Sequence, residues 1–288
     1  MLPIKHFLLA IQFFTRIPIT GRLAAWVGYS PAMLRASAAH FAGVGYLVGA
    51  VAAGVFWLCL QVLPGTFAPL IAAALSTVAT VMLTGGFHED GLADVADGLG
   101  GSYERARALE IMKDSRVGAF GAMALCLVLL CKAATLAGLG EVGRLINLEA
   151  AHFDAALVCL TIVAAHVCSR AAPLVLIALL PHVGDSATSK SKPLADQISA
   201  KGLLVGIFWI FPLIVTVIWL KCAIYFVVSL VLMLLALLYM WRLFARRLQG
   251  FTGDCLGATQ QVCEVAFYVG ALVAMGGAGG PGGAVFGG

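Results

Sequence analysis

The sequence has few charged residues and none of the cysteine patterns that hold small or zinc-binding proteins together. Only 11% of its 288 residues are Asp, Glu, Lys or Arg, less than half the usual share in a soluble domain, which is about 25%. Its eight cysteines contain no CxxC pair, so we expect neither a disulfide framework nor a zinc site. The net charge of +4 comes from short, scattered basic groups. No long basic stripe is present, which argues against nucleic acid as a partner.

Hydrophobic residues make up 61% of the chain, and they gather in runs long enough to cross a bilayer as helices. We predict an all-α, polytopic integral membrane protein in which residues 1–288 form a single membrane-embedded domain. About seven transmembrane helices are expected, at residues 38–63, 66–87, 117–138, 154–180, 202–220, 222–241 and 262–278.

Both ends of the chain differ from these spans. Residues 1–37 begin with an amphipathic stretch that lacks a small-residue cleavage site. This pattern favours an interfacial helix at the membrane surface over a cleaved signal peptide. Whether the stretch lies on the membrane or crosses it is left open by its length. The glycine-rich residues 279–288 are expected to form a flexible tail.

The distribution of lysine and arginine predicts the orientation. Fourteen of the eighteen lie in segments on the same side as the N-terminus, and two, Arg144 and Lys221, lie on the opposite side. By the positive-inside rule the N-terminal side faces the cytoplasm. We therefore expect a multi-pass protein of the cell inner membrane, with residues 88–116 and 250–261 forming two cytoplasmic parts of one active site.

The most polar stretch, residues 84–121, holds seven of the fourteen acidic residues. Asp90, Asp94 and Asp97 are spaced four and three residues apart, so a helix would place them on one face. Their mutual repulsion would be relieved by a hard cation, and all-oxygen ligands favour magnesium or manganese over zinc. Glu89 is a possible extra ligand. A solvated acidic loop is the alternative, but the interleaved apolar residues favour the helix.

Several neighbouring residues are suited to phosphate groups. Gly91 and Gly98 would let a ligand's phosphates approach the backbone. In the KDSR stretch that follows, Lys113 and Arg116 could hold phosphate oxygens while Asp114 serves as a metal ligand or a base. Anchoring at the membrane edge is an equally good interpretation for Lys113 and Arg116 taken singly.

Two further places combine polar residues with apolar surroundings. Arg170 lies deep inside an expected span, where an arginine is costly without a polar partner. It is therefore a candidate substrate contact, with a partnership to a buried carboxylate as the alternative. Thr252 and Asp254 lie in a glycine-rich turn before the last span and could contact phosphate or metal. A helix N-cap accounts equally well for Asp254.

Five motifs along the chain together resemble the cobalamin synthase family, the adenosylcobinamide-GDP ribazoletransferases. They are FFTRIP at 13–18, GGFHEDGLADVADGLGG at 85–101, IMKDSRVGAFG at 111–121, SRAAP at 169–173 and GFTGDCLGA at 250–258. The resemblance implies a membrane phosphotransferase that uses magnesium. It implies that adenosylcobinamide-GDP reacts with alpha-ribazole, or with its 5′-phosphate, to give adenosylcobalamin, or its phosphate, and GMP.

The chemistry of such a transfer agrees with the polar residues. It requires a metal to neutralise the leaving nucleotide, cations to hold the phosphoryl group and a carboxylate to take a proton from the ribose hydroxyl. Asp90 and Asp94 are assigned to the metal, and Asp97 to the metal or the base. Asp114 is the other candidate base, and the phosphate contacts are Lys113, Arg116 and Arg170.

Two other classes of function are weighed against this one. A transporter for a cation or a corrinoid would explain charged residues within spans, but most of the charge gathers at one rim rather than at mid-membrane. A non-catalytic anchor would leave the aspartates unexplained. We also expect either a homo-oligomer or association with other enzymes of cobalamin assembly.

Overall fold

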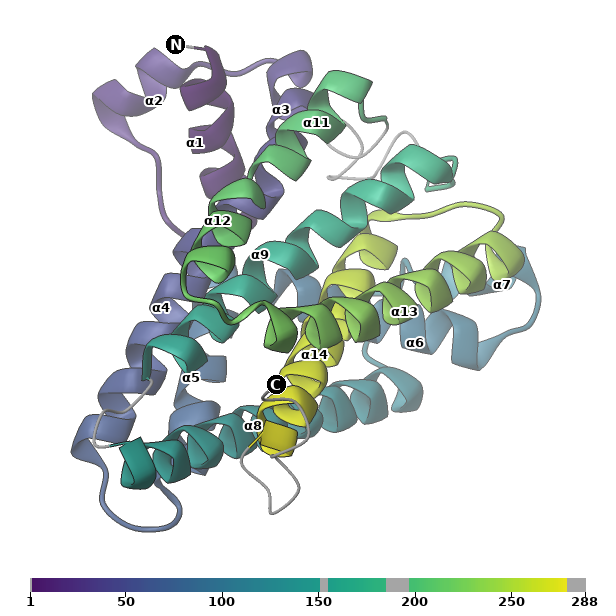
Figure 1. The fold of residues 1–288 in the computed structure, drawn as a ribbon. Coiled ribbons are helices and arrows are strands. Elements are labelled where there is room, and N and C mark those ends of the chain that lie inside the picture. The colour runs from purple at the N-terminus through teal and green to yellow at the C-terminus, as the bar shows by residue number, and fades with distance from the viewer. Residues whose placement is uncertain (1, 151–154, 185–196, 279–288) are drawn as a thin grey trace.

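The computed structural model describes residues 2–150, 155–184 and 197–278, and every regular element in these ranges is a helix (Figure 1). This confirms the all-α prediction. Six helical segments in the described ranges are long and apolar enough to cross a membrane, and a bent helix pair would make a seventh. The six are Pro31–Val62, Ala119–Arg144, Ala156–Leu179, Ala200–Trp219, Ala223–Arg247 and Gly253–Gly276.

The bent pair positions the acidic stretch. Helix α5 (Ala68–Thr84) is followed by α6 (Phe87–Gly101), and the two are bent by 91°. Gly85 and Gly86 make the bend with φ of 72° and 71°, a left-handed backbone that glycine adopts without steric cost. The predicted acidic helix therefore exists, and it turns away from the axis of α5 instead of continuing it. The short helix α7 (Arg105–Ile111) follows.

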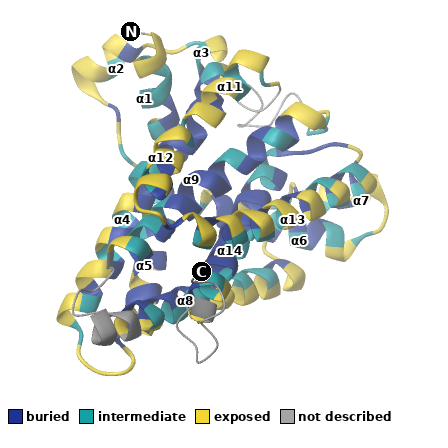
Figure 2. Ribbon diagram, in the orientation of Figure 1, coloured by how far each residue is buried: buried dark blue, intermediate teal, exposed yellow. Residues whose placement is uncertain are grey.

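Two helices form the centre of the molecule. Helix α9 (Ala155–Leu179) packs along α4 (Phe41–Val62), and α14 (Gly253–Ala278) contacts α6, α8 (Ala119–Ala150), α9 and α13 (Ala223–Arg247). Gly45 allows α4 to approach α9 closely, because a Cβ there would lie 2.5 Å from the carbonyl oxygen of His166. Figure 2 shows α9 and α14 mainly buried, whereas α12 (Phe211–Trp219) and α13 carry exposed faces.

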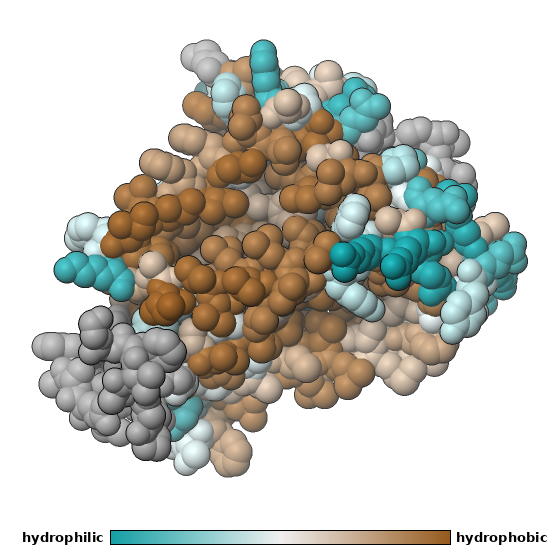
Figure 3. Space-filling view, turned by 45° about the vertical axis from the view of Figure 1, so that its right-hand side comes forward, coloured by the Kyte–Doolittle hydropathy of each residue, from teal (hydrophilic) through white to brown (hydrophobic). Residues whose placement is uncertain are grey.

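Those exposed faces are apolar. Figure 3 shows a broad hydrophobic surface, with the largest hydrophilic group on the right and smaller ones at the other edges of the view. Exposed large side chains of α12 and α13 include Ile218, Trp219, Leu234 and Tyr239. A surface of this kind belongs against lipid hydrocarbon. The chain is accordingly a multi-pass membrane protein.

The N-terminal segment is folded against the helical body. Helix α1 (Leu2–Phe14) precedes α2 (Gly21–Val27), α3 (Pro31–Ser37) and the 3₁₀ turn η1 (Ala38–His40). Leu9, Ala10 and Phe14 of α1 are buried, and α1 packs on α3 and α4. The segment after α1 is thereby held beside the bend between α5 and α6, where the backbone N–H of Arg16 donates to the carbonyl of Leu83 at 2.7 Å.

Three expectations about boundaries need correction or comment. Residues 253–261 are not a loop: α14 begins at Gly253, and the hydroxyl of Thr252 accepts a 3.5 Å hydrogen bond from the N–H of Cys255 at its start. The span expected at 202–220 is confirmed as the candidate span Ala200–Trp219, which consists of two consecutive helices, α11 (Ala200–Phe208) and α12, with Pro212 in the first turn of α12. The expected flexible tail at 279–288 lies outside the described residues.

Candidate active site

The acidic face of α6 meets the start of α14. Asp90 is exposed, Asp94 is half-buried and Asp97 is buried. Gly91, on the same helix, packs directly on Asp254, because a Cβ at Gly91 would lie 2.8 Å from the Asp254 carbonyl oxygen. The absence of a side chain at Gly91 therefore brings the two acidic segments of the sequence together. Gly91 is used here for helix packing.

Repulsion among these carboxylates is visible in the ionisation of Asp94. Partial burial, followed by the negative charges of Asp254, Asp90 and Asp97, raises the pKa of Asp94 to about 7. A cation bound between these carboxylates would reduce their mutual repulsion. Asp90 and Asp94, which the sequence assigns to the metal, are therefore close enough to affect each other's ionisation. Asp254 acts on Asp94 in the same way.

The donor chemistry of this group fits magnesium. Within the described ranges, no three His, Cys, Asp or Glu side chains are arranged to hold a metal ion by themselves. Magnesium does not require such a cage, since it usually retains several waters and binds one or two carboxylates together with substrate phosphates. Asp90, Asp94 and Asp254 are the residues that could hold it here.

Asp97 has a different environment. Its carboxylate accepts hydrogen bonds from the N–H of Gly118 at 2.7 Å and of Gly121 at 2.8 Å, so it caps the N-terminus of α8. A Cβ at Gly118 would lie 2.5 Å from a carboxylate oxygen of Asp97. The glycines of the VGAFG motif therefore make room for this carboxylate. With both oxygens already accepting an N–H, Asp97 is less free to bind metal or a proton than the spacing predicted.

Glu89 points into the protein interior instead of toward the acidic face. It is 9% exposed, and its carboxylate accepts a 3.0 Å hydrogen bond from the side-chain amide of Gln261. Gln261 in turn donates to the Gln260 side chain at 2.9 Å, and Gln260 donates to Glu264 at 2.6 Å. The structure thus favours a place in a buried polar network for Glu89 over the predicted role as an extra metal ligand.

Arg170 belongs to the same network. It is fully buried, with its guanidinium 2.9 Å from the Nδ1 atom of His166 and 3.1 Å from the His166 carbonyl. His166 Nδ1 lies 3.3 Å from the Glu264 carboxylate, and the guanidinium carbon lies 5.8 Å from the Phe41 ring centre. Arg170 is thus connected to the buried Glu264 carboxylate through His166, and its burial favours this structural role over direct contact with substrate phosphate.

The KDSR stretch lies beside Asp97. Lys113, Asp114, Arg116 and Asp97 line one open hollow of about 830 Å³ between α6, α7 and the start of α8. Hydrogen bonds from the exposed Arg116 side chain, the shortest 2.6 Å, lower the pKa of Asp114 to about 2. A carboxylate so acidic is a weak proton acceptor at neutral pH, which weakens Asp114 as a general base. We call this space the KDSR hollow.

Gly98 and Thr252 also have local structural partners. A Cβ at Gly98 would lie 2.8 Å from the carbonyl of Ala108, so this glycine lets α7 pack on α6. The Thr252 hydroxyl donates to the Asp254 carboxylate at 3.1 Å. Thr252 therefore fixes the orientation of Asp254 beside Asp94.

Arg16 lies at the other end of the acidic face, beside Asp90. It was not among the site residues predicted from the sequence. Arg16 and Asp90 line a hollow of about 590 Å³ between the end of α1 and the bend from α5 to α6. Gly85 lies beneath the Arg16 guanidinium, where any Cβ would collide with it. The signal that could have found Arg16 is the FFTRIP motif, whose partner segment only the fold reveals. We call this space the Arg16 hollow.

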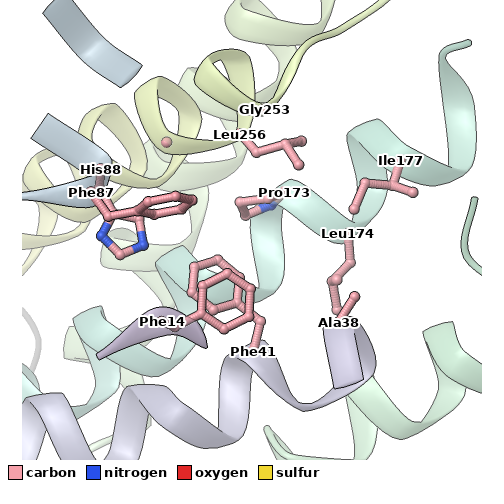
Figure 4. Close-up of a pocket in the computed structure, with 11 residues that line it drawn as sticks. Phe14, Ala38, Phe41, Phe87, His88, Pro173, Leu174, Ile177, Gly253 and Leu256 are labelled. Carbon is pink, nitrogen blue, oxygen red and sulfur yellow. The ribbon is translucent and has the colours of Figure 1, made fainter. Parts of the chain in front are cut away.

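A small apolar cavity separates the acidic helix from the N-terminal segment (Figure 4). Phe14, Phe41, Phe87 and His88 surround it, with Pro173 of α9 opposite. Phe14 stacks on Phe41 with ring centres 4.1 Å apart, and His88 stacks on Phe41 at 5.5 Å. These rings connect α1, α4 and α6, so the N-terminal helix is part of the scaffold of the site.

Comparison with known proteins decides the family. The profile described as cobalamin-5-phosphate synthase matches residues 6–272. This chain belongs to the cobalamin-5-phosphate synthase family. A relative from Polaromonas naphthalenivorans, named adenosylcobinamide-GDP ribazoletransferase, is 63% identical over 274 residues, which cover 94% of this chain and 99% of the relative. No solved structure matches the chain.

More distant members of the cobalamin-5-phosphate synthase family carry the same name. The relative from Albidiferax ferrireducens is 58% identical, with 94% of this chain and 99% of the relative covered. The relative from Vibrio cholerae is 39% identical, with 92% of each covered. These matches confirm the resemblance drawn from the five motifs, and they favour an enzyme over a transporter or an anchor.

Proposed function

We propose that this chain is a membrane phosphotransferase that performs the reaction named for its relatives, with adenosylcobinamide-GDP as donor and alpha-ribazole or its 5′-phosphate as acceptor. In this reaction a ribose hydroxyl of the acceptor forms a new bond to the phosphorus nearest the cobinamide. The bond from that phosphorus to GMP breaks, and GMP leaves. The observation that carries the proposal is the family match over nearly the whole chain.

The arrangement of the site supports this chemistry. The acidic face of α6 runs between the Arg16 hollow at Asp90 and the KDSR hollow at Asp97. Each hollow combines a cationic side chain with an end of the acidic face, so two anionic substrates could approach the same carboxylates from different sides. Arg116 in the KDSR hollow carries a side chain that is 87% exposed, as a residue that meets an incoming nucleotide must be.

Magnesium is the cofactor we propose, held by Asp90, Asp94 and Asp254. When bound, it would neutralise charge on the phosphates of the donor. Asp97 stays a candidate for the proton acceptor, since it is buried at the edge of the KDSR hollow and each oxygen retains a free lone pair beside its N–H bond. Asp114 would orient Arg116 through their ion pair of 2.6 Å.

We place the protein in the cell inner membrane, with the acidic face toward the cytoplasm. The distribution of lysine and arginine supports this orientation, as does the need of such an enzyme for cytoplasmic nucleotides. A homo-oligomer or a complex with other cobalamin-assembly enzymes would place several such sites in one membrane region.

The test of the proposed function is the formation of GMP by the purified protein in detergent. Adenosylcobinamide-GDP and alpha-ribazole are supplied with and without magnesium, and Asp90→Asn is compared with the unaltered chain. We expect magnesium-dependent GMP release by the unaltered chain and a much lower rate at the same magnesium concentration in Asp90→Asn, provided that this variant retains the thermal unfolding transition. Binding of the corrinoid without GMP release would contradict the proposal.

A further inference from the structure

The Arg16 hollow has the features of a site for an aromatic phosphate ester. Its volume of about 590 Å³ lies in the range of small-molecule sites, about 300–1,000 Å³. Arg16 and Asp90 provide one charge of each sign. Phe13 and Phe87 provide two aromatic walls with ring centres 5.7 Å apart at an angle of 79°.

The Arg16 side chain is available to a ligand. It forms no hydrogen bond or ion pair with any residue in the described ranges. Its backbone is nevertheless fixed, because its N–H donates to Leu83 at 2.7 Å and the Thr15 hydroxyl accepts from the N–H of Ile17 at 3.1 Å. A guanidinium on an anchored backbone loses little freedom when it binds an anion in its two-pronged geometry.

The glycine bend places this guanidinium beside the acidic helix. Gly85 has φ of +72° and lies directly beneath the Arg16 side chain. A residue with a side chain would be strained at this φ and would displace the guanidinium. The bend that turns α6 away from α5 thus also determines where Arg16 lies relative to Asp90.

We propose that the Arg16 hollow binds the acceptor of the reaction as its phosphate monoester, ribazole 5′-phosphate, with the Arg16 guanidinium on the phosphate and the aromatic base against Phe13 and Phe87. This assignment rests on the proposed function. The phosphate and the reacting hydroxyl are on different carbons of the ribose, so Arg16 holds one end of the sugar while the hydroxyl points along the acidic face of α6 toward Asp97 and the donor. The donor nucleotide then occupies the KDSR hollow, whose Lys113 and Arg116 suit its larger negative charge.

The test compares two acceptors on the same enzyme. GMP release is measured with ribazole and with ribazole 5′-phosphate for the unaltered chain, Arg16→Gln, Arg16→Lys and the control Arg22→Gln. Arg22 is an exposed arginine of the neighbouring α2 that does not line the hollow. A purely structural defect would lower kcat/KM for both acceptors equally.

We expect Arg16→Gln to lower kcat/KM for ribazole 5′-phosphate by about 10- to 100-fold, the usual effect of losing hydrogen bonds to a charged group. The value for ribazole should stay within about twofold, and Arg16→Lys should lie between, because lysine keeps the charge without the fork. Arg22→Gln should match the unaltered chain. An equal loss for both acceptors, or no loss for either, would overturn the assignment.

A second arm separates the substrate from a lipid headgroup, which also presents a phosphate. The assay is repeated in nanodiscs of phosphatidylcholine with increasing phosphatidylglycerol. Unchanged use of ribazole 5′-phosphate supports the assignment. Competition by phosphatidylglycerol that disappears in Arg16→Gln would identify a lipid site and overturn it. Absence of GMP with both acceptors in the unaltered chain would instead refute the proposed function on which the assignment rests.

Discussion

Lys132 of α8 and Glu264 of α14 form an ion pair of 2.7 Å in the interior of the molecule, with side chains 3% and 1% exposed. This pair joins two membrane-spanning helices at a depth where neither charge can reach water. Glu264 also accepts from Gln260 and lies near His166 of α9. The pair is thus the centre of the polar network that connects α8, α9 and α14.

Lys132→Met should destabilise the protein strongly, because it leaves Glu264 with less compensating charge in a buried site. Removing one partner of a buried pair costs about 3–5 kcal/mol. Glu141→Ala is the control, since its pair with Arg144 is 3.8 Å long with side chains 50% and 43% exposed, and an exposed pair contributes at most about 1 kcal/mol. Thermal unfolding in detergent measures both, and equal shifts would contradict the structural role of the buried pair.

Glu89 and Asp90 are neighbours in sequence but should respond differently to substitution. Glu89→Gln keeps an oxygen that can accept from Gln261, so we expect the magnesium concentration for half-maximal activity to change less than about twofold. Asp90→Asn should raise that concentration about tenfold or more, since a neutral oxygen is a poorer ligand for a hard cation. Magnesium titrations of GMP release measure both. Equal increases for the two variants would return Glu89 to the metal site.

The sequence was sufficient to predict the class of fold, because long apolar runs can be read directly from the order of residues along the chain. It also located the acidic helix, since aspartates at helical spacing among small apolar residues define one face. The direction of each side chain was harder to predict. Glu89 points into the interior, where it contacts α14, and Asp90 lines the Arg16 hollow. These directions depend on how α14 packs against α6, which cannot be read from the spacing of residues on α6.

Other parts of the site depend on contacts between distant segments. Asp97 is occupied by the N–H groups of Gly118 and Gly121, and this requires the first turn of α8 to reach α6. Arg16 joins the site only because α1 folds against the α5–α6 bend. The sequence predicts a loop up to residue 261, because Gly250, Gly253 and Gly257 are typical of turns. Helix α14 instead begins at Gly253. A Cβ at Gly257 would lie 3.2 Å from His88, so this glycine allows α14 to pack against α6.

The cap on α8 provides a stability test that is independent of activity. Asp97→Ala removes two hydrogen bonds from a carboxylate to backbone N–H groups, and bonds to charged groups contribute about 1.5–3 kcal/mol each. We expect a lower unfolding temperature together with faster amide hydrogen exchange in the first turn of α8. Asp114→Ala is the control, because Asp114 is bonded to its own loop neighbour Arg116. Unchanged exchange at residues 118–121 in Asp97→Ala would contradict the cap.

The pKa of Asp94 predicts how magnesium dependence varies with pH. Burial and the charges of Asp254, Asp90 and Asp97 raise this pKa to about 7 without a bound cation, so Asp94 is protonated below that pH and must release its proton when a cation binds. The magnesium concentration for half-maximal activity should therefore rise as pH falls below 7, by up to about tenfold per pH unit for one released proton.

The raised pKa of Asp94 also makes the stability of the metal-free protein depend on pH: the metal-free protein is less stable at high pH, whereas magnesium binds better there. Because the pKa of Asp94 in the folded state lies above its ordinary value of 3.8, the stabilisation from protonated Asp94 is complete below about pH 4 and is lost as pH rises through 7. Without magnesium, the unfolding temperature should fall between pH 5 and pH 8, and added magnesium should restore it at pH 8. The side chain of Asn does not ionise, so in Asp94→Asn the magnesium requirement and the unfolding temperature should both vary less with pH. If its magnesium requirement still rose below pH 7 as steeply as that of the unaltered chain, the proton would be released from a different carboxylate.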